Sequence, residues 1–370
     1  MKIALVGCGF VADYYMSTLP NHPQLKLVGV FDKDPARLQA FTRFHNVRAY
    51  ASLANLLADE EVQLVVNLTN PRSHYAVSKI CLEHGKHVYS EKPLAMEYEQ
   101  ALELVEFAEQ NGLALSSAPC SLLGEAAQTL LHAVRSEVVG KARLVYAELD
   151  DGLLHRMAYK KWVSASGAPW PYKDEFEVGC TLEHAGYYLT WLIAMFGPVV
   201  SLTAQAMCLI PDKVPGEILS PSDTPDCSIG ILVFESGVVA RLTTTVIGPH
   251  DHMIRVMGDK GVISLKDCWM NDARVYVRPL ITLRRKSFLL PFGWRYKAPG
   301  VVRKLVRATG SSRMDYALGI ADLAMSVQEK KTAKISARFS LHVTEVALAL
   351  HGATASGRTY LTRSRPNINE

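Results

Sequence analysis

The first 120 residues alternate between two hydrophobic patterns. Short runs of Val, Ile and Leu are typical of buried parallel strands, and the stretches between them have the polar or proline starts of helices. The predicted strands are 3–6, 25–31, 63–67, 87–89 and 113–116, and the predicted helices are 12–19, 35–44, 73–84 and 96–111. Strands joined by right-handed helical crossovers predict an α/β fold, a doubly wound parallel Rossmann sheet, over residues 1–120.

The pattern changes after residue 120. Helices and strand pairs that meet at turn sequences follow, and residues 162–172, rich in Trp, Pro and Gly, are typical of an irregular loop. The predicted helices are 122–136, 179–196, 316–329 and 341–353, and the predicted strands are 142–149, 228–234, 238–246, 254–257 and 262–265. This order predicts an α+β domain over residues 121–370, with a mostly antiparallel open sheet that serves substrate binding and oligomerisation.

Composition narrows the class of protein. The 370 residues are 49% hydrophobic and 21% charged, which fits an ordinary two-domain globular protein and excludes disordered, collagen-like and coiled-coil chains. No run approaches eighteen uncharged apolar residues, and no signal-peptide pattern opens the chain. Seven cysteines stand at 8, 81, 120, 180, 208, 227 and 268 without a C-x-x-C pair. We therefore expect a cytoplasmic protein with neither a disulfide framework nor a metal site.

A dinucleotide fingerprint follows the first predicted strand. Residues 7–12 read Gly-Cys-Gly-Phe-Val-Ala, in which the first glycine makes a tight turn and the second lets a pyrophosphate approach the helix N-terminus. Asp32, at the end of the second strand, is placed to accept the ribose hydroxyls of NAD and to repel the 2′-phosphate of NADP. Lys33 beside it softens that discrimination, so NADP is not excluded. The residues expected to contact the cofactor here are Gly7, Gly9, Phe10, Val11, Asp32, Lys33 and Arg37.

Two further segments carry a family resemblance. NLTNPRSH (67–74) and GKHVYSEKP (85–93), with the glycine fingerprint, resemble the signatures of the Gfo/Idh/MocA oxidoreductases, a family that includes glucose-fructose oxidoreductase, inositol dehydrogenases and nucleotide-sugar dehydrogenases. The resemblance implies that Lys92 lies at the nicotinamide edge and hydrogen-bonds the substrate oxygen that reacts. It also implies cofactor contacts from Thr69, Asn70, Pro71, His74, Glu91 and Lys92.

The same resemblance implies catalytic residues on a helix of the second domain. The family has an Asp there and, four residues later, a His or Tyr; alignment without a gap gives Glu183 and Tyr187, on one helix face. Tyr187 would exchange the proton, and Glu183 would orient the substrate or assist the relay. A shift by one residue nominates His184 and Tyr188 instead, and His184 stays a second candidate base. The structural alternative is that these polar residues only cap and line a half-buried helix.

Three aromatic residues precede that helix. Trp162, Trp170 and Tyr172 either stack on a sugar ring in the substrate site or anchor the loop by hydrophobic contacts. Asp150 and Asp151, at a strand end, either bind sugar hydroxyls or cap a turn, and the turn is favoured for Asp151.

The net charge of +4 is unevenly distributed. Residues 281–314 hold nine Lys or Arg and no Asp or Glu, so the rest of the chain sums to about −5, which argues against a nucleic-acid-binding protein. The segment either brackets the diphosphate of a nucleotide sugar, rests on an anionic membrane surface, or is a solvated excursion between two strands that is partly used in oligomer contacts.

Together these features favour an NAD(P)-dependent oxidoreductase. Its expected substrate is a secondary hydroxyl or ketone of a sugar, nucleotide sugar or cyclitol, with Lys92 and Tyr187 handling the proton. The alternatives are a glycoside hydrolase or epimerase that recycles bound NAD, and a non-enzymatic dinucleotide-binding sensor. By analogy with the family, we expect a homodimer or homotetramer that associates through the C-terminal sheet.

Overall fold

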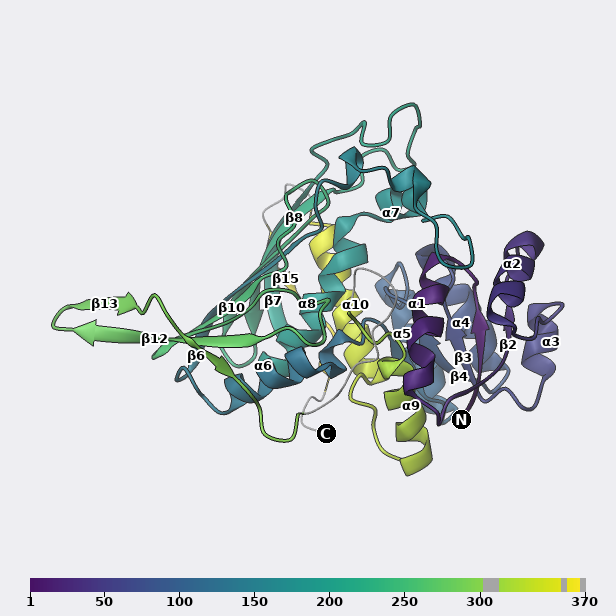
Figure 1. Cartoon of the computed structure of the whole chain (residues 1–370), viewed down its shortest axis with the longest axis horizontal. Helices are drawn as coiled ribbons and strands as arrows, with labels where there is room; N and C mark the ends of the chain where they lie inside the picture. The colour runs from purple at the N-terminus through teal and green to yellow at the C-terminus, as the bar shows by residue number, and fades with distance from the viewer. Residues whose placement is uncertain (302–312, 354–357, 367–370) are drawn as a thin grey trace.

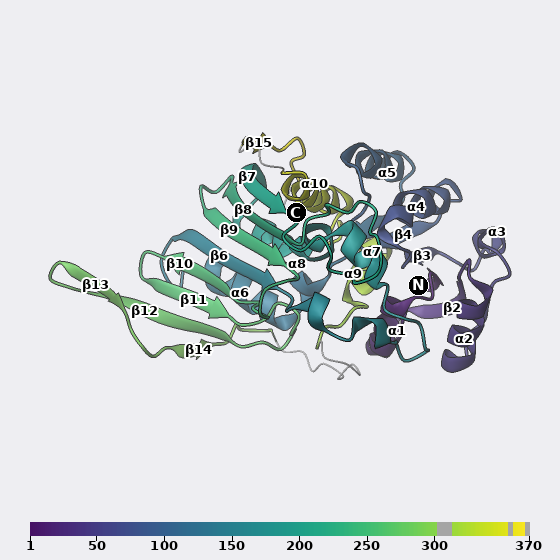
Figure 2. The ribbon, with the colours of Figure 1, turned by 90° about the horizontal axis from the view of Figure 1, so that it is seen from above.

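The computed structural model describes residues 1–301, 313–353 and 358–366. Three of the nine cations of the basic segment, Arg303, Lys304 and Arg307, therefore lie outside the described residues. Two sheets lie side by side, with helices at their junction (Figures 1 and 2). No described helix combines the length and apolar character needed to cross a membrane.

The first sheet is parallel, with strand order β2-β1-β3-β4-β5, and it confirms the predicted Rossmann arrangement. Its strands are β1 (Lys2–Val6), β2 (Lys26–Phe31), β3 (Leu64–Asn67), β4 (His87–Ser90) and β5 (Leu115–Ser117). The helices are α1 (Phe10–Thr18), α2 (Pro35–His45), α3 (Leu53–Ala58), α4 (His74–Glu83) and α5 (Tyr98–Gln110). Within this first domain, the short helix α3 was not predicted from the sequence.

The strands of this sheet end in line. Val6 pairs with Phe31 and Asn67, and Ser90 pairs with Asn67 and Ser117. The residues that follow each strand therefore emerge along one edge of the sheet, where doubly wound folds bind ligands.

The second sheet is mostly antiparallel, in the order β13-β12-β11-β10-β6-β9-β8-β7-β15, and β14 pairs with β12. Its main strands are β6 (Ala142–Asp150), β7 (Val199–Met207), β8 (Cys227–Phe234), β9 (Val239–Thr245), β10 (Ile254–Gly258), β11 (Gly261–Leu265) and β12 (Val275–Leu283). The shorter strands are β13 (Lys286–Leu289), β14 (Trp294–Tyr296) and β15 (Tyr360–Leu361). Helices α6 (Glu125–Arg135), α8 (Cys180–Phe196) and α10 (Ala337–His351) pack on one face, and the other face is left open (Figure 2).

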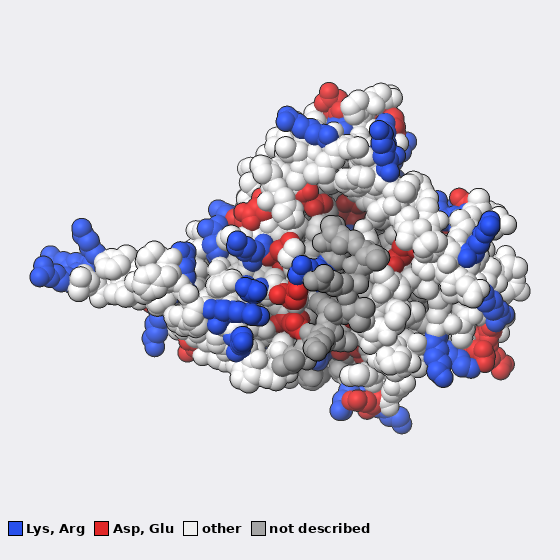
Figure 3. Space-filling model, viewed as in Figure 1, with Lys and Arg blue, Asp and Glu red and all other residues white. Residues whose placement is uncertain are grey.

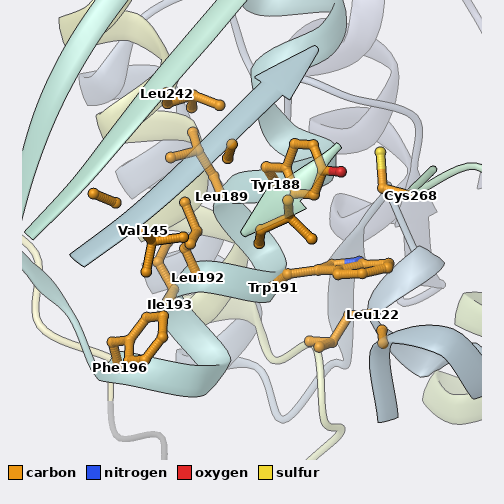
Figure 4. Packing of buried hydrophobic residues seen from close by; sticks show 14 of the residues in the cluster. Leu122, Val145, Tyr188, Leu189, Trp191, Leu192, Ile193, Phe196, Leu242 and Cys268 are labelled. Atoms are coloured by element: carbon orange, nitrogen blue, oxygen red, sulfur yellow. The ribbon is translucent and has the colours of Figure 1, made fainter. Parts of the chain in front are cut away.

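Helix α8 is buried because its apolar residues recur at helical spacing. Leu189, Leu192, Ile193 and Phe196 share a core cluster with Val145 of β6 and Leu242 of β9, and Tyr188 points toward Cys268 (Figure 4). Full burial of such side chains is worth about 1.5–3 kcal/mol each. This packing fixes the rotation of α8, so the polar residues of its first two turns have defined positions.

The last two helices return to the first sheet. Helix α9 (Leu318–Glu329) packs on β4 and β5, and α10 packs against both α5 and α8. Gly319 lies so close to the ring of Tyr89 that an added Cβ would clash with it. The C-terminal segment therefore supports strand β4, which leads into the E-K-P signature. The division of the chain into domains at residue 120 stays a prediction.

Strands β12 and β13 form a hairpin that projects from the second sheet (Figure 1). Its turn holds Arg284, Arg285 and Lys286, and Leu283 and Phe288 beside them are exposed; the cations gather at the tip in Figure 3. The start of the basic segment is thus an extension of two paired strands. Its binding partner stays a prediction.

Candidate functional site

The turn between β1 and α1 leaves room for a dinucleotide. Gly7 has a φ of +103°, and an added Cβ would lie 2.6 Å from the Leu68 carbonyl oxygen, so a side chain is excluded there. Gly9 is the N-cap of α1 and has no side-chain cap, and a Cβ built on it would meet nothing within 4 Å. The first amides of α1 therefore face open space, which fits the pyrophosphate of NAD.

Asp32 is fixed at the end of β2 by backbone amides. Its buried carboxylate accepts hydrogen bonds from Cys8 N and Asp34 N, both at 2.8 Å, and Arg37 Nη1 lies 3.7 Å away. A negative group is thus held beside the glycine turn, as an adenosine ribose requires. Arg37 provides a cation next to it, consistent with the expectation that NADP is not excluded.

The loops that follow β3 and β4 are held together by buried polar contacts. The Glu91 carboxylate accepts from Tyr15 Oη on α1 at 2.6 Å and from Lys92 N at 3.1 Å. The buried His74 ring lies between Pro93 O at 2.7 Å and Thr69 O at 2.8 Å, and burial lowers its pKa. His74 and Glu91 therefore position the E-K-P loop.

The loop after β3 also contacts the second domain. Thr69 Oγ1 donates to Asn67 Oδ1 at 2.6 Å, and Asn70 Nδ2 donates to Asp174 on α7 (Tyr172–Val178). Pro71 begins the short 3₁₀ turn that leads into α4. The predicted cofactor residues 69–71 thus lie at the junction of the two domains.

At that junction Lys92 meets Glu183. The Lys92 ammonium donates a hydrogen bond to Glu183 Oε2, and the two side chains are 18% and 7% exposed. Burial alone would lower the pKa of Lys92, but Glu183, Glu175 and Glu91 outweigh that effect and raise it. Lys92 therefore stays an ammonium, which can donate a hydrogen bond but cannot serve as a base.

His184 faces a different group of residues. Its Nε2 lies 3.4 Å from Glu175 Oε1 and 3.5 Å from Asp151 Oδ2, and its buried Nδ1 has no hydrogen-bond partner among the described residues. Burial, followed by the charge of Lys92, lowers its pKa well below the usual range. His184 is therefore a neutral imidazole at physiological pH.

The two tyrosines of α8 have different surroundings. Tyr188 is fully buried in the core (Figure 4), and it donates its hydroxyl hydrogen to His252 O. Tyr187 keeps some exposure and packs edge-on against Trp269, with ring centroids 5.5 Å apart. Burial raises the pKa of Tyr187 well above its usual value, so its phenol remains protonated. Of the two, only Tyr187 is accessible to a substrate.

The predicted sugar-stacking aromatics pack on one another. Trp162 and Trp170 have ring centroids 5.0 Å apart, and Tyr172 lies 5.3 Å from Tyr159 and donates to Glu217 at 2.9 Å. They belong to a small hydrophobic cluster around Phe176. These contacts are those of loop anchors, and a contact with substrate stays a prediction.

Several residues of the site had no clear sequence signal. Glu175 lies on the short helix α7, and its burial together with the charge of Glu183 raises its pKa well above the usual range. Asp267 and His252 come together near Trp269. The one available signal is the His-x-His sequence at 250–252, from which no prediction followed.

Comparisons with known proteins identify the family of the chain. A family model described as "Oxidoreductase family, NAD-binding Rossmann fold" matches residues 1–118. A second model, described as "GFO/IDH/MocA C-terminal domain", matches residues 127–264. An uncharacterized oxidoreductase of Synechocystis sp. is 25% identical over 300 residues, 76% of each chain. Trans-1,2-dihydrobenzene-1,2-diol dehydrogenase of Bos taurus is 24% identical over 317 residues, 84% of this chain and 85% of the relative.

A solved structure shares the whole fold. The WlbA dehydrogenase from Bordetella pertussis, in complex with NADH and UDP-GlcNAcA, superposes with a TM-score of 0.73 over 98% of both chains at 17% identity. The chain therefore belongs to the GFO/IDH/MocA family, and it is an NAD-dependent oxidoreductase that acts on CH–OH groups.

Proposed function

We propose that this protein oxidises a secondary hydroxyl, or reduces the corresponding ketone, of a sugar, nucleotide sugar or cyclitol. The observation that carries the proposal is the buried Lys92–Glu183 pair, which stands at the carboxyl edge of the first sheet beside the dinucleotide turn. The cofactor, when bound, supplies the hydride acceptor or donor. The UDP-GlcNAcA bound by the structural relative supports the sugar class.

Lys92 stabilises the negative charge that develops on the reacting oxygen. Because its pKa is raised, it donates a hydrogen bond to the carbonyl or alkoxide throughout the reaction. Glu183, which accepts from the same ammonium, orients it toward the substrate. Glu91, held by Tyr15, fixes the backbone from which Lys92 extends.

The proton passes through one of two residues of α8. Tyr187 lies four residues after Glu183 on the same helix face, and its protonated phenol suits donation to a carbonyl oxygen during reduction. His184 is neutral, and its Nδ1 has no partner within the described part of the chain, so it suits acceptance of a hydroxyl proton during oxidation. We assign proton donation during reduction to Tyr187, and His184 is the second candidate, as the base during oxidation.

The test is a single-turnover absorbance experiment. NAD-loaded protein is mixed with free, phosphorylated and nucleotide-linked sugars and cyclitols, and the reduced-nicotinamide band is followed. A band that rises and persists supports the proposal and identifies the substrate class. A band that rises and decays without an added oxidant points to a hydrolase or epimerase, and no response from protein with bound NAD contradicts the proposal.

Lys92→Ala tests the central residue. We expect turnover to fall by at least about 10²-fold, because a donor to the reacting oxygen is lost, while NAD affinity stays within about tenfold, or about 1.4 kcal/mol. Lys173→Ala is a matched control, since this half-exposed lysine of α7 pairs only loosely with Glu177 at 3.9 Å. Turnover that is equal in both variants would remove Lys92 from the mechanism. Tyr187→Phe and His184→Asn then identify the proton carrier.

A further inference from the structure

A cluster of imidazole and carboxylate groups lies next to His184, outside the residues assigned above. Asp151 follows β6, and His250 and His252 follow β9; the two His rings have centroids 4.0 Å apart. One carboxylate oxygen of Asp151 and one ring nitrogen of each histidine all lie within 4.8 Å of one another. Three potential ligand atoms, from the loop after β6 and the loop between β9 and β10, therefore lie close together.

His252 has an unpaired nitrogen at that point. Its side chain is fully buried, and its Nδ1 lies 3.3 Å from Asp267 Oδ1, which places the ring proton on Nδ1. Its Nε2 is buried and has no hydrogen-bond partner among the described residues. The nearest oxygen of Asp151 is 3.9 Å away, beyond hydrogen-bond distance. A lone pair and a carboxylate thus face each other across a gap, an arrangement that a cation stabilises.

We propose that Asp151, His250 and His252 bind a first-row divalent transition-metal ion such as Zn²⁺. Two imidazoles and one carboxylate form a ligand set that such ions prefer, and the Asp267–His252 contact is the outer-sphere interaction that orients a metal-binding histidine. A tetrahedral Zn²⁺ site needs ligand atoms about 3.4 Å apart. Because the His250 side chain is 54% exposed, it can move the remaining distance without disturbing the core.

A second possible set, His252 with Asp267 and Cys268, fits less well. Asp267 Oδ1 already accepts from Trp269 N at 2.8 Å and faces Nδ1 of His252, and Cys268 is packed in the core beside Tyr188 (Figure 4). The site with Asp151 leaves one coordination position open for a water or a substrate oxygen. Asp151 Oδ2 lies 3.5 Å from His184 Nε2, so the site borders the polar residues of α8.

This proposal departs from the sequence expectation of no metal site. That expectation came from cysteine spacing, which carries no information about imidazole and carboxylate ligands. The Asp151 side chain was also expected to cap a turn, whereas its nearest imidazoles are His184 Nε2 at 3.5 Å and His252 Nε2 at 3.9 Å.

Metal binding can be measured without substrate or cofactor. The full-length protein is stripped with a chelator and titrated with Zn²⁺ by calorimetry and with Co²⁺ by visible absorption. We expect one equivalent per chain and a cobalt spectrum of nitrogen and oxygen ligands, without a thiolate charge-transfer band. Zn²⁺ should also raise the melting temperature, since it binds only the folded site.

Two variants and a control make the assignment specific. Asp151→Asn and His250→Ala should each weaken Zn²⁺ binding at least tenfold, and His250→Ala should fold normally because its side chain is half exposed. Asp251→Asn, an exposed neighbour outside the three-residue set, should bind as the wild type does. The proposal is overturned if the wild type binds less than one equivalent at about 100 µM Zn²⁺, if the two variants bind unchanged, or if cobalt gives a thiolate spectrum.

Discussion

The C-terminal segment is attached to α10 by one buried carboxylate. Glu345, only 1% exposed, accepts hydrogen bonds from Arg363 N at 2.5 Å, from Ser364 N at 2.9 Å and from Tyr360 Oη at 2.9 Å. Burial alone would raise the pKa of Glu345, but the hydrogen bonds from His342, Arg363 and Ser364 outweigh it and lower the pKa to about 2. Helix α10 packs against α5 of the first domain and α8 of the second, so the Glu345 contacts attach the C-terminal segment to a helix of the domain junction.

The change in pKa gives the size of the expected effect. The pKa of Glu345 falls from 4.5 to about 2 on folding. A lowered pKa stabilises the folded state fully above pH 4.5, and the gain is lost as the pH falls toward 2. The gain is about 3 kcal/mol at neutral pH and about 1.4 kcal/mol near pH 3. Glu345→Gln should therefore lower the free energy of unfolding by about 3 kcal/mol at neutral pH.

The assay is urea unfolding of wild type and variant in parallel, followed by tryptophan fluorescence at several pH values. The difference between the two proteins should shrink by about half from pH 7 to about pH 3. Glu99→Gln is the matched control, because Glu99 contacts the same segment through Arg363 Nη1 at 2.9 Å but is 71% exposed, and it should change little. A difference between wild type and Glu345→Gln that does not vary with pH would refute the role of the ionised carboxylate.

Two further predictions concern the cofactor and the assembly. Asp32→Asn removes the charge that repels a 2′-phosphate, while Arg37 stays 3.7 Å away. The ratio of NADP affinity to NAD affinity, measured by fluorescence titration, should therefore rise about tenfold or more. An unchanged ratio would contradict the role of Asp32. Ile231 is 45% exposed on the open sheet face, so we expect Ile231→Lys to weaken self-association at least tenfold, as measured by light scattering. Ile218→Lys is the control, because Ile218 is 88% exposed and lies away from the sheet, and it should leave self-association unchanged. A monomeric wild type would contradict this prediction.

The first domain was predictable because its signals are local and its geometry is regular. The alternation of strands and helices predicted a doubly wound parallel sheet, and parallel pairing brings Asp32, the glycine turn and Glu91 to one edge. No contact between distant segments had to be known. The resemblance to the family, confirmed by the comparisons, rests on these same segments.

The second domain was less predictable because distant contacts decide its details. No strand was predicted at β7, whose burial comes from α10, and none was predicted for β12 and β13, which pair where the basic segment begins. Glu175 and Asp267 gave no signal, since neither belongs to a spaced motif. Their positions depend on α7 and on the loop after β11, which meet α8 only in the folded chain.

The Lys92–Glu183 pair shows why neither domain carries the site alone. Taking an unpaired ammonium out of water costs several kcal/mol, so Lys92 could not be buried at the edge of the first sheet by itself. Glu183 compensates that charge, and the rotation of α8 that presents Glu183 is set by Tyr188, Leu189 and Leu192 in the core of the second domain. Lys92 is therefore stable as a buried ammonium only when the two domains are docked so that Glu183 reaches it. A substitution in the core of α8 that rotates the helix should weaken the site as surely as a change of Glu183 itself.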